Sequence, residues 1–172
     1  MHIYLLGVSH DQQTDPSPEF VAYIKATCRR HGIRSFAEEL SLDGLSDVGA
    51  SESILKRIAD GMDVPHKYCG PTRRERAQRG ILGSQDIQIQ AFQDDWPPSR
   101  IDEEEKRYFG KIEYAWLEKL RPVFVDPMLF VCGAAHLDSF PQKAKEGGFT
   151  AIVLEPTFIT SGDDFIRKRT KK

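Results

Sequence analysis

The sequence has little that is typical of secreted, membrane-embedded or zinc-stabilised proteins. Its three cysteines, Cys28, Cys69 and Cys132, are odd in number and never form a Cys-x-x-Cys pair, which argues against a disulfide framework and a structural zinc site. The longest apolar runs, such as residues 128–132, are far too short to span a bilayer, and the N-terminus lacks the pattern of a signal peptide. We therefore expect reduced, buried thiols and a cytoplasmic protein without a membrane partner.

An excess of one charge and the common nucleotide-binding motifs are also missing. The 24 Lys and Arg and 26 Asp and Glu residues give a net charge of −2, and basic residues gather only at 73–76 and 167–172. This balance provides no general attraction to nucleic acid. No Gly-x-Gly-x-x-Gly, phosphate-loop or Gly-x-Ser-x-Gly pattern follows the first apolar run, so the usual dinucleotide, nucleoside triphosphate and serine hydrolase sites have no anchor. We expect a small-molecule or peptide substrate and no nucleic acid partner.

Length and composition are those of an ordinary folded domain. A chain of 172 residues with 40% hydrophobic and 29% charged residues can bury a sizeable core without disulfides or structural metal. We expect residues 1–160 to form a single α/β domain and residues 161–172 to form a flexible basic tail.

Short apolar runs alternate with segments of helical periodicity along most of the chain. Expected strands are residues 1–7, 33–40, 64–69, 128–132 and 149–154, and expected helices are 19–31, 54–62, 72–79, 101–120 and 140–146. This alternation predicts an α/β fold with a mainly parallel central sheet and helices on both faces. Residues 82–100 are expected to form a long irregular or lid-like excursion, with a brief edge strand possible at 87–89.

Two Gly-x-x-His segments, residues 7–10 and 133–136, each follow an apolar run that is expected to be a strand. A glycine after a strand lets the backbone turn tightly or approach a ligand, and a histidine three residues later exposes a ring nitrogen at the start of the next loop. The alternative for each copy is a structural turn with a hydrogen-bonded histidine. Two copies at equivalent strand ends favour one shared site.

Several chemically active side chains fall at or near the expected carboxyl ends of strands, where ligands of open parallel sheets usually bind. They are His10, Glu38, Glu39, His66 and His136. Two imidazoles and one carboxylate are a familiar ligand set for a divalent transition metal such as Mn, Co or Zn. Because strand side chains alternate, only one of the two glutamates is expected to face inward, and His66, beside Pro65, is expected to be structural or peripheral.

Two aspartates directly follow the Gly-x-x-His segments. Asp11 comes one residue after His10, and Asp138 comes two residues after His136. A carboxylate that hydrogen-bonds the second nitrogen of an imidazole determines its tautomer and orientation. We expect this role for Asp11 and Asp138.

Three stretches of the chain together resemble the superfamily that contains the TIKI/TraB proteins, the erythromycin esterases and the ChaN-like proteins. These are Leu5-Leu6-Gly7-Val8-Ser9-His10-Asp11, then Ser35-Phe36-Ala37-Glu38-Glu39-Leu40, and finally Phe130 to Leu137 continued by Gly148 to Val153. The resemblance implies Glu39 as the acid of the site, with Glu38 as its reserve. It also implies that the helix with Glu113 precedes the second motif, which makes Glu113 a candidate to support the site or to bind substrate. Where related sequences carry an arginine before that glutamate, Ile112 stands here, and Arg107 is the nearest upstream candidate.

Members of that superfamily include metal-dependent peptidases, esterases without an obvious metal, and proteins that bind haem or iron. We therefore expect a hydrolase of ester or peptide bonds, assisted by a divalent metal, with His10, Glu39 and His136 as its catalytic and metal-binding residues. One alternative is a non-catalytic module for a small ligand or haem, or a regulatory protein with a degenerate site. Another is a partner-binding protein that uses residues 82–100.

Overall fold

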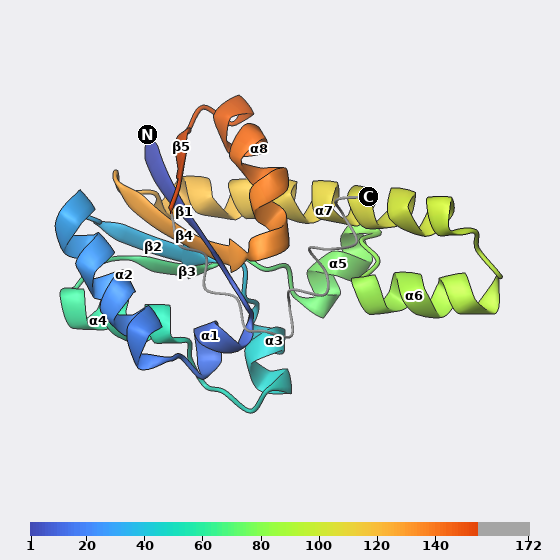
Figure 1. Ribbon diagram of the computed structural model, residues 1–172, viewed down its shortest axis with the longest axis horizontal. Helices are drawn as coiled ribbons and strands as arrows, with labels where there is room; N and C mark the ends of the chain where they lie inside the picture. Colours follow the sequence, from blue (N-terminus) through green and yellow to red (C-terminus); the bar gives the residue numbers. More distant parts are fainter. Residues whose placement is uncertain (155–172) are drawn as a thin grey trace.

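Five parallel strands form the centre of the computed structural model, which describes residues 1–154 (Figure 1). The strands are β1 (His2–Val8), β2 (Ser35–Glu38), β3 (His66–Tyr68), β4 (Met128–Gly133) and β5 (Thr150–Val153). They lie in the order β3-β2-β4-β1-β5, and each neighbouring pair is parallel. The predicted α/β fold with a parallel sheet is confirmed.

The helices begin and end largely where the capping residues indicate. They are α1 (Asp11–Thr14), α2 (Pro18–His31), α3 (Leu42–Asp47), α4 (Ile54–Met62), α5 (Arg73–Arg79), α6 (Ser84–Gln93), α7 (Pro98–Leu120) and α8 (Phe140–Glu146), with 3-10 turns η1 (Arg121–Val123) and η2 (Ala134–Asp138). The side chain of Ser17 caps α2, which ends at Gly32 in the left-handed conformation. Ser53 caps α4, and Thr72 with Glu75 forms a capping box on α5.

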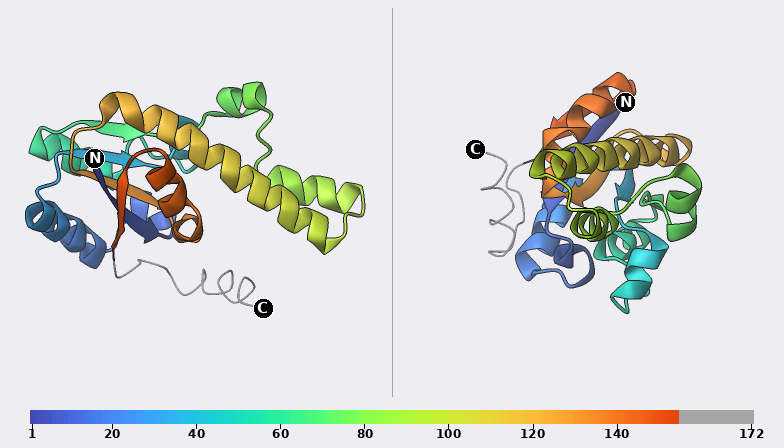
Figure 2. Two further views of the ribbon diagram at one scale, coloured as in Figure 1. Left: turned by 90° about the horizontal axis from the view of Figure 1, so that it is seen from above. Right: turned by 90° about the vertical axis from the view of Figure 1, so that its right-hand side faces the viewer.

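Helices cover both faces of the sheet and divide the core into two layers (Figures 1 and 2). On one face, α2 and α4 pack against a cluster that includes Leu6, Phe36 and Val131. On the other face, α7 and α8 pack against residues of the alternate set, including Leu5 and Phe130. Both sides of β1, β2 and β4 are therefore buried, as expected for parallel strands between helices.

The connections after neighbouring strands leave the sheet in opposite directions. After β1 and β2 the chain continues into α2 and α4 on one face, whereas after β4 it continues through η2 into α8 on the other. Because β4 lies between β1 and β2, the carboxyl end of β4 is a point where the direction of winding changes. Ligands of open α/β sheets usually bind at such a point.

Most of residues 82–100 are helical, so the expected irregular structure and the possible edge strand at 87–89 are wrong, although the segment does leave the sheet. Residues 84–93 form α6, and α7 already begins at Pro98. Together α6 and the first half of α7 extend beyond the sheet as a helical hairpin (Figures 1 and 2). Ile87 and Ala91 are its buried residues on α6, four apart, which is a helical spacing that the intervening glutamines had obscured.

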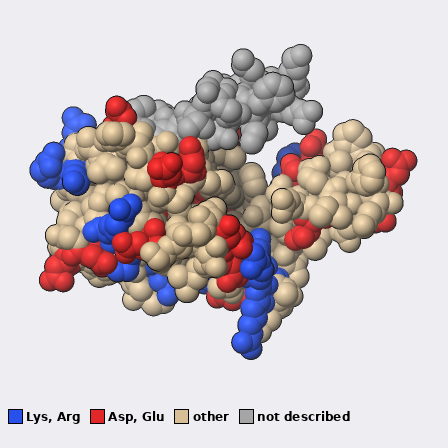
Figure 3. All heavy atoms as spheres, turned by 90° about the horizontal axis from the view of Figure 1, so that it is seen from below, with Lys and Arg blue, Asp and Glu red and all other residues tan. Residues whose placement is uncertain are grey.

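None of the helices within residues 1–154 combines the length and apolar composition that crossing a bilayer requires. On the face shown in Figure 3, basic and acidic side chains are interspersed and form no single basic patch. The expected tail, residues 161–172, and the expected end of the domain at residue 160 lie outside the described residues.

Candidate functional site

Three neighbouring strands deliver His10, Glu39 and His136 to one place. His10 follows β1, Glu39 follows β2 and His136 lies in η2 after β4, and β4 is paired with both of the other strands. The backbone amide of Glu39 still donates to the carbonyl of Val131 on β4, which continues the ladder to this point. The structure therefore brings together the three residues that the sequence motifs select.

Glu39 is the centre of this cluster. Its carboxylate is 5% exposed, with Oε1 2.7 Å from Nδ1 of His10 and Oε2 3.8 Å from Nε2 of His136. These distances place a ring nitrogen of each histidine beside one oxygen of the carboxylate. Burial by itself would raise the pKa of Glu39, but interaction with His10, then with His136 and the amide of Gly133, lowers it. A buried carboxylate thus stays ionised between two imidazoles.

Gly133 provides the space in which Glu39 and His10 meet. A Cβ atom at this position would lie 3.1 Å from Oε1 of Glu39 and 3.3 Å from Cε1 of His10. The backbone of Gly133 has φ −55° and ψ 137°, which other residues adopt without strain. The glycine is therefore needed for close approach and not for its conformational freedom.

Gly133→Ala should consequently disturb the cluster while leaving the fold nearly unchanged. We expect the free energy of unfolding to fall by less than about 1 kcal/mol, because the added methyl meets movable side-chain ends. We also expect any activity of the cluster to fall at least about tenfold, because small displacements of reacting groups are costly. Urea denaturation and activity assays measure the two effects. A variant with full activity would contradict this role of Gly133.

The glycine of the first motif has a different function. Gly7 lies within β1, and a Cβ atom there would come within 2.5 Å of Cδ1 of Leu137 and 3.1 Å of Cα of Ala134. Gly7 thus lets η2, which contains His136, pack directly on β1. The first Gly-x-x-His segment therefore contains His10 and, through the contact of Gly7 with η2, also positions His136.

His136 is held in a single orientation by its surroundings. Its Nδ1 is 2.8 Å from Oε1 of Glu113 on α7, and its ring packs at 4.3 Å from Phe109 and 4.5 Å from Trp116, measured between ring centroids. A carboxylate only accepts hydrogen bonds, so Nδ1 carries the proton when Glu113 is ionised. Nε2 is then the nitrogen that accepts a proton, and it faces Glu39.

Glu113 is fully buried and receives three hydrogen bonds. Besides His136, Ser139 donates to Oε1 at 2.6 Å and Lys143 donates to Oε2 at 2.6 Å. Burial would raise the pKa of Glu113, but these donors together outweigh it and lower the pKa. Glu113 is therefore an ionised, fully bonded support for His136.

Tyr108 lies close enough to Glu39 for the two to interact electrostatically. Burial raises the pKa of Tyr108, and the negative charge of Glu39 raises it further. The hydroxyl therefore stays protonated and able to donate. Tyr108 also lines a cavity of about 200 Å³ between α6 and α7, together with Arg107 and Lys111.

Glu38 and Glu39 point to opposite faces of the sheet, and both are buried. The expectation that only one of them faces inward is wrong, because helices cover both faces. Glu38 accepts from Ser53 and lies 2.7 Å from Nε2 of His66, whose side chain is also buried. Burial dominates here and raises the pKa of Glu38, although His66 and Ser53 counteract it. His66 thus belongs to a structural cluster at the start of α4, as the sequence interpretation favoured.

Three other residues predicted for the site are not brought into the cluster. Asp11 and Asp138 are exposed, and the partner that orients His136 is Glu113. Arg107 is exposed and pairs with Glu104 on its own helix at 2.8 Å. Asp138 is wrong as the orienting partner because η2 turns its side chain to solvent while α7 passes directly behind the ring.

Sequence reasoning also missed several residues that complete the cluster. Ser139 and Lys143 support Glu113, and Phe109 packs on His136. One signal was available: Phe109, Glu113 and Trp116 recur at helical spacing, so a carboxylate stands on the apolar face of α7. A buried carboxylate needs donors, and Lys143 on the next helix is the cation that the topology can bring there.

The donors of the cluster fit a divalent cation in kind, because they are two imidazoles and a carboxylate. Two ligands about 2.1 Å from one ion lie about 3.4 Å apart in a tetrahedral site. The distance from Glu39 to His10 is shorter and that to His136 is longer. Within residues 1–154, no three His, Cys, Asp or Glu side chains are arranged around a common point. His10 is 73% exposed, so it is the ligand that would turn if the three shared an ion.

The cysteines are free and buried, as expected. Burial raises the pKa of Cys28 to about 11 and that of Cys69 to about 12, and it raises the pKa of Cys132 well above its usual value. Cys132, which directly precedes Gly133, is therefore an inert thiol rather than a nucleophile. This agrees with the expectation that the thiols are buried.

Comparison of the chain with protein-family profiles, with curated proteins and with solved structures returned no match. The resemblance to the TIKI/TraB, erythromycin esterase and ChaN-like superfamily therefore stays a prediction from the motifs. The function of the site has to be inferred from its geometry and chemistry.

Proposed function

We propose that the chain is a hydrolase of ester or peptide bonds whose reacting water is activated between His136 and Glu39. One observation carries the proposal: Nε2 of His136, held as an acceptor by Glu113, faces the ionised carboxylate of Glu39 across 3.8 Å at the point where the sheet changes its direction of winding. A carboxylate, an imidazole and a reacting group in sequence are the parts of general base catalysis.

The proposed reaction uses residues of this chain at each step. A water molecule near Nε2 of His136 gives one proton to that nitrogen, and its oxygen bonds to the carbonyl carbon of the substrate. The electron pair of the carbonyl double bond moves onto the carbonyl oxygen and re-forms the double bond when the leaving group departs. The resulting imidazolium lies between the carboxylates of Glu113 and Glu39, which stabilise its charge. The bond to the alcohol or amine then breaks, and the leaving group takes the proton from Nε2. An acid and an alcohol or amine are the products.

A divalent cation belongs to the proposal as an assisting group. His10, Glu39 and His136 would hold it, and it would supply Lewis-acid stabilisation of charge on the carbonyl oxygen. His136 would then help to hold the cation and would not act as the base. Mn, Co and Zn are the metals suited to this mixture of imidazole and carboxylate.

The test is a screen of ester and peptide substrates with and without added Mn, Co or Zn, using wild type, His10→Ala and His136→Gln. We expect hydrolysis that falls about 10²- to 10⁴-fold in His136→Gln. His10→Ala should separate the two versions of the site, because the His10 ring is exposed and its removal opens no cavity in the core.

If His10→Ala abolishes both activity and retention of the metal, the metal-assisted version is supported. If His10→Ala keeps activity that does not respond to metals, water activation by His136 and Glu39 suffices. Hydrolysis that is unaffected by both variants would overturn the assignment of this site. No turnover, combined with visible absorbance of a bound haem, would support the alternative of a non-catalytic binding module.

A further inference from the structure

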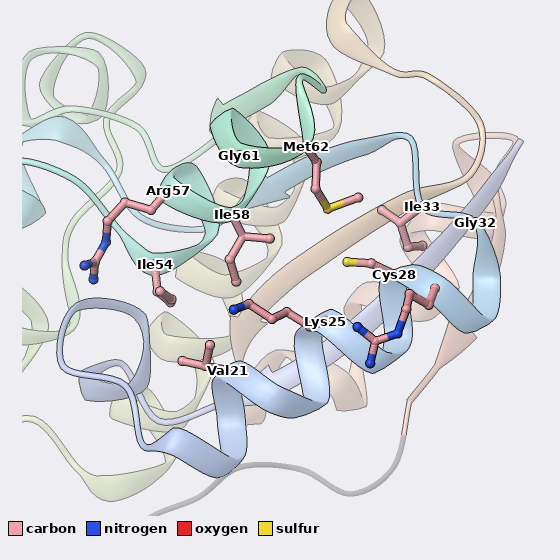
Figure 4. Close-up of a pocket in the computed structure, with 11 residues that line it drawn as sticks. Val21, Lys25, Cys28, Gly32, Ile33, Ile54, Arg57, Ile58, Gly61 and Met62 are labelled. Atoms are coloured by element: carbon pink, nitrogen blue, oxygen red, sulfur yellow. The ribbon is translucent and has the colours of Figure 1, made fainter.

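A groove between α2 and α4 lies on the face of the sheet opposite α7, away from the side chains that support His136. Its volume is about 830 Å³, within the range of about 300–1,000 Å³ that pockets for small ligands occupy. Figure 4 shows the side chains of Val21, Ile58 and Met62 projecting into the space between the two helices. This groove is independent of the function proposed for Glu39.

The base of the groove is apolar. Both helices and the segment after α2 contribute to it, and its apolar side chains are Val21, Cys28, Ile33, Ile54, Ile58 and Met62. Met62 is 40% exposed, while Ile33 and Ile58 retain a small accessible area. An apolar surface of this kind between helices is a place where an aliphatic chain loses contact with water.

The charged residues of the groove all have one sign. Lys25 and Arg29 on α2 and Arg57 on α4 line it, and no acidic residue is among its described lining residues. Arg57 lies 3.8 Å from Glu52, but across residues 1–154 neither Lys25 nor Arg29 forms an ion pair with a carboxylate. Figure 4 shows Lys25 extending from α2 into the gap. Among the described residues, two cations without a carboxylate partner therefore stand beside an apolar base.

Lys25 and Arg29 are four residues apart on one helix, so their side chains lie on the same face. A carboxylate between them would receive charge-assisted hydrogen bonds from an ammonium and from a planar guanidinium. The aliphatic chain attached to that carboxylate would run over Ile33, Ile58 and Met62. An uncharged apolar ligand would form no charge-assisted hydrogen bonds with Lys25 and Arg29, and a cationic ligand would be repelled by them.

We propose that this groove binds the free carboxylate of a medium- or long-chain fatty acid, with Lys25 and Arg29 at the head group and the space between α2 and α4 for the chain.

Isothermal titration of the full chain with octanoate, decanoate and dodecanoate, each below its critical micelle concentration, tests the proposal. We expect one site per chain and an affinity that rises about fourfold for each added methylene. The double variant Lys25→Gln/Arg29→Gln should bind dodecanoate about tenfold more weakly. Arg30→Gln is the matched control, because Arg30 is exposed on the same helix but does not line the groove.

Other occupants predict different results. Dodecyltrimethylammonium should not bind, and binding equal to that of dodecanoate would overturn the role of the cations. Association with phosphatidylglycerol vesicles without binding of free dodecanoate would indicate a membrane surface and overturn the proposal. Light scattering tests whether a second copy of the chain occupies the groove. A dimer that Met62→Glu dissociates and dodecanoate does not would assign the groove to that second copy and overturn the proposal. Equal weakening in Arg30→Gln would also overturn it.

Discussion

Glu113→Leu is expected to lower the free energy of unfolding by about 3–5 kcal/mol, since it removes one partner of a buried ion pair. Glu113 is fully buried and accepts from His136, Ser139 and Lys143 at 2.6 to 2.8 Å. Without it, the ammonium of Lys143 and Nδ1 of His136 lose their acceptor in a region that water reaches poorly. Urea unfolding followed by tryptophan fluorescence measures the change, because Trp116 packs against His136.

Two variants give this measurement its controls. Glu113→Gln keeps an acceptor for Nδ1 and should cost about 1–3 kcal/mol. Glu118→Gln removes an exposed carboxylate of the same helix, paired with Arg79, and should change stability by less than about 0.5 kcal/mol. If Glu113→Leu is as stable as Glu118→Gln, the proposed support of His136 is wrong.

The pH dependence of stability should also report the ionisation of Glu113. The pKa of Glu113 is lower in the folded protein than in the unfolded chain. Its stabilising contribution is therefore fully present above the unfolded value near 4.5 and is lost as pH falls through the folded value. Glu113→Gln should lose less stability than wild type between neutral pH and acid.

Glu39→Gln is expected to lower hydrolytic activity about 10²- to 10⁴-fold with a small change in stability. The amide has nearly the same shape, but it removes the negative charge that faces Nε2 of His136. Because the pKa of Glu39 is lowered in the fold from its ordinary value of 4.5, protonation of this carboxylate should not limit activity above that pH.

Glu38→Gln is the natural control, since the two glutamates are adjacent but face different layers. Its amide oxygen can still accept from Ser53 and His66. We expect activity within about threefold of wild type and a change confined to stability, which kinetic assays and urea unfolding separate. Equal losses of activity in Glu38→Gln and Glu39→Gln would indicate a general effect of destabilisation and would contradict a specific role for Glu39.

Helix ends and strand positions were largely predictable because their causes are local. Ser17 and Gly32 bracket α2, and the predicted helix at 140–146 matches α8. Where local signals compete, the prediction was wrong: Ile87 and Ile89 alternate with glutamines and suggested a strand, but the segment is a helix that buries Ile87 and Ala91 and packs against α7. The alternation of apolar and polar residues, which is typical of a strand, was outweighed by the contact between the two helices.

The candidate site was predictable in its central residues and not in its arrangement. The Gly-x-x-His segments select His10 and His136, and the resemblance to the superfamily favours Glu39 over Glu38 at the acidic end of β2. The orienting partner was assigned to nearby Asp138, yet the structure uses Glu113, 23 residues away in the chain. Which buried donors and acceptors meet depends on how helices dock, and distance along the chain carries little information about it.

The sequence by itself determined the alternation of strands and helices, the places where they end, and the glycines and histidines that follow two of the strands. These features depend on side-chain periodicity and capping, which act over a few residues. Only the tertiary structure decided that β4 lies between β1 and β2, that Glu38 and Glu39 enter different layers, and that Glu113 stands behind His136. The reason is that strand order and the pairing of buried charges depend on long-range packing of the two faces of the sheet.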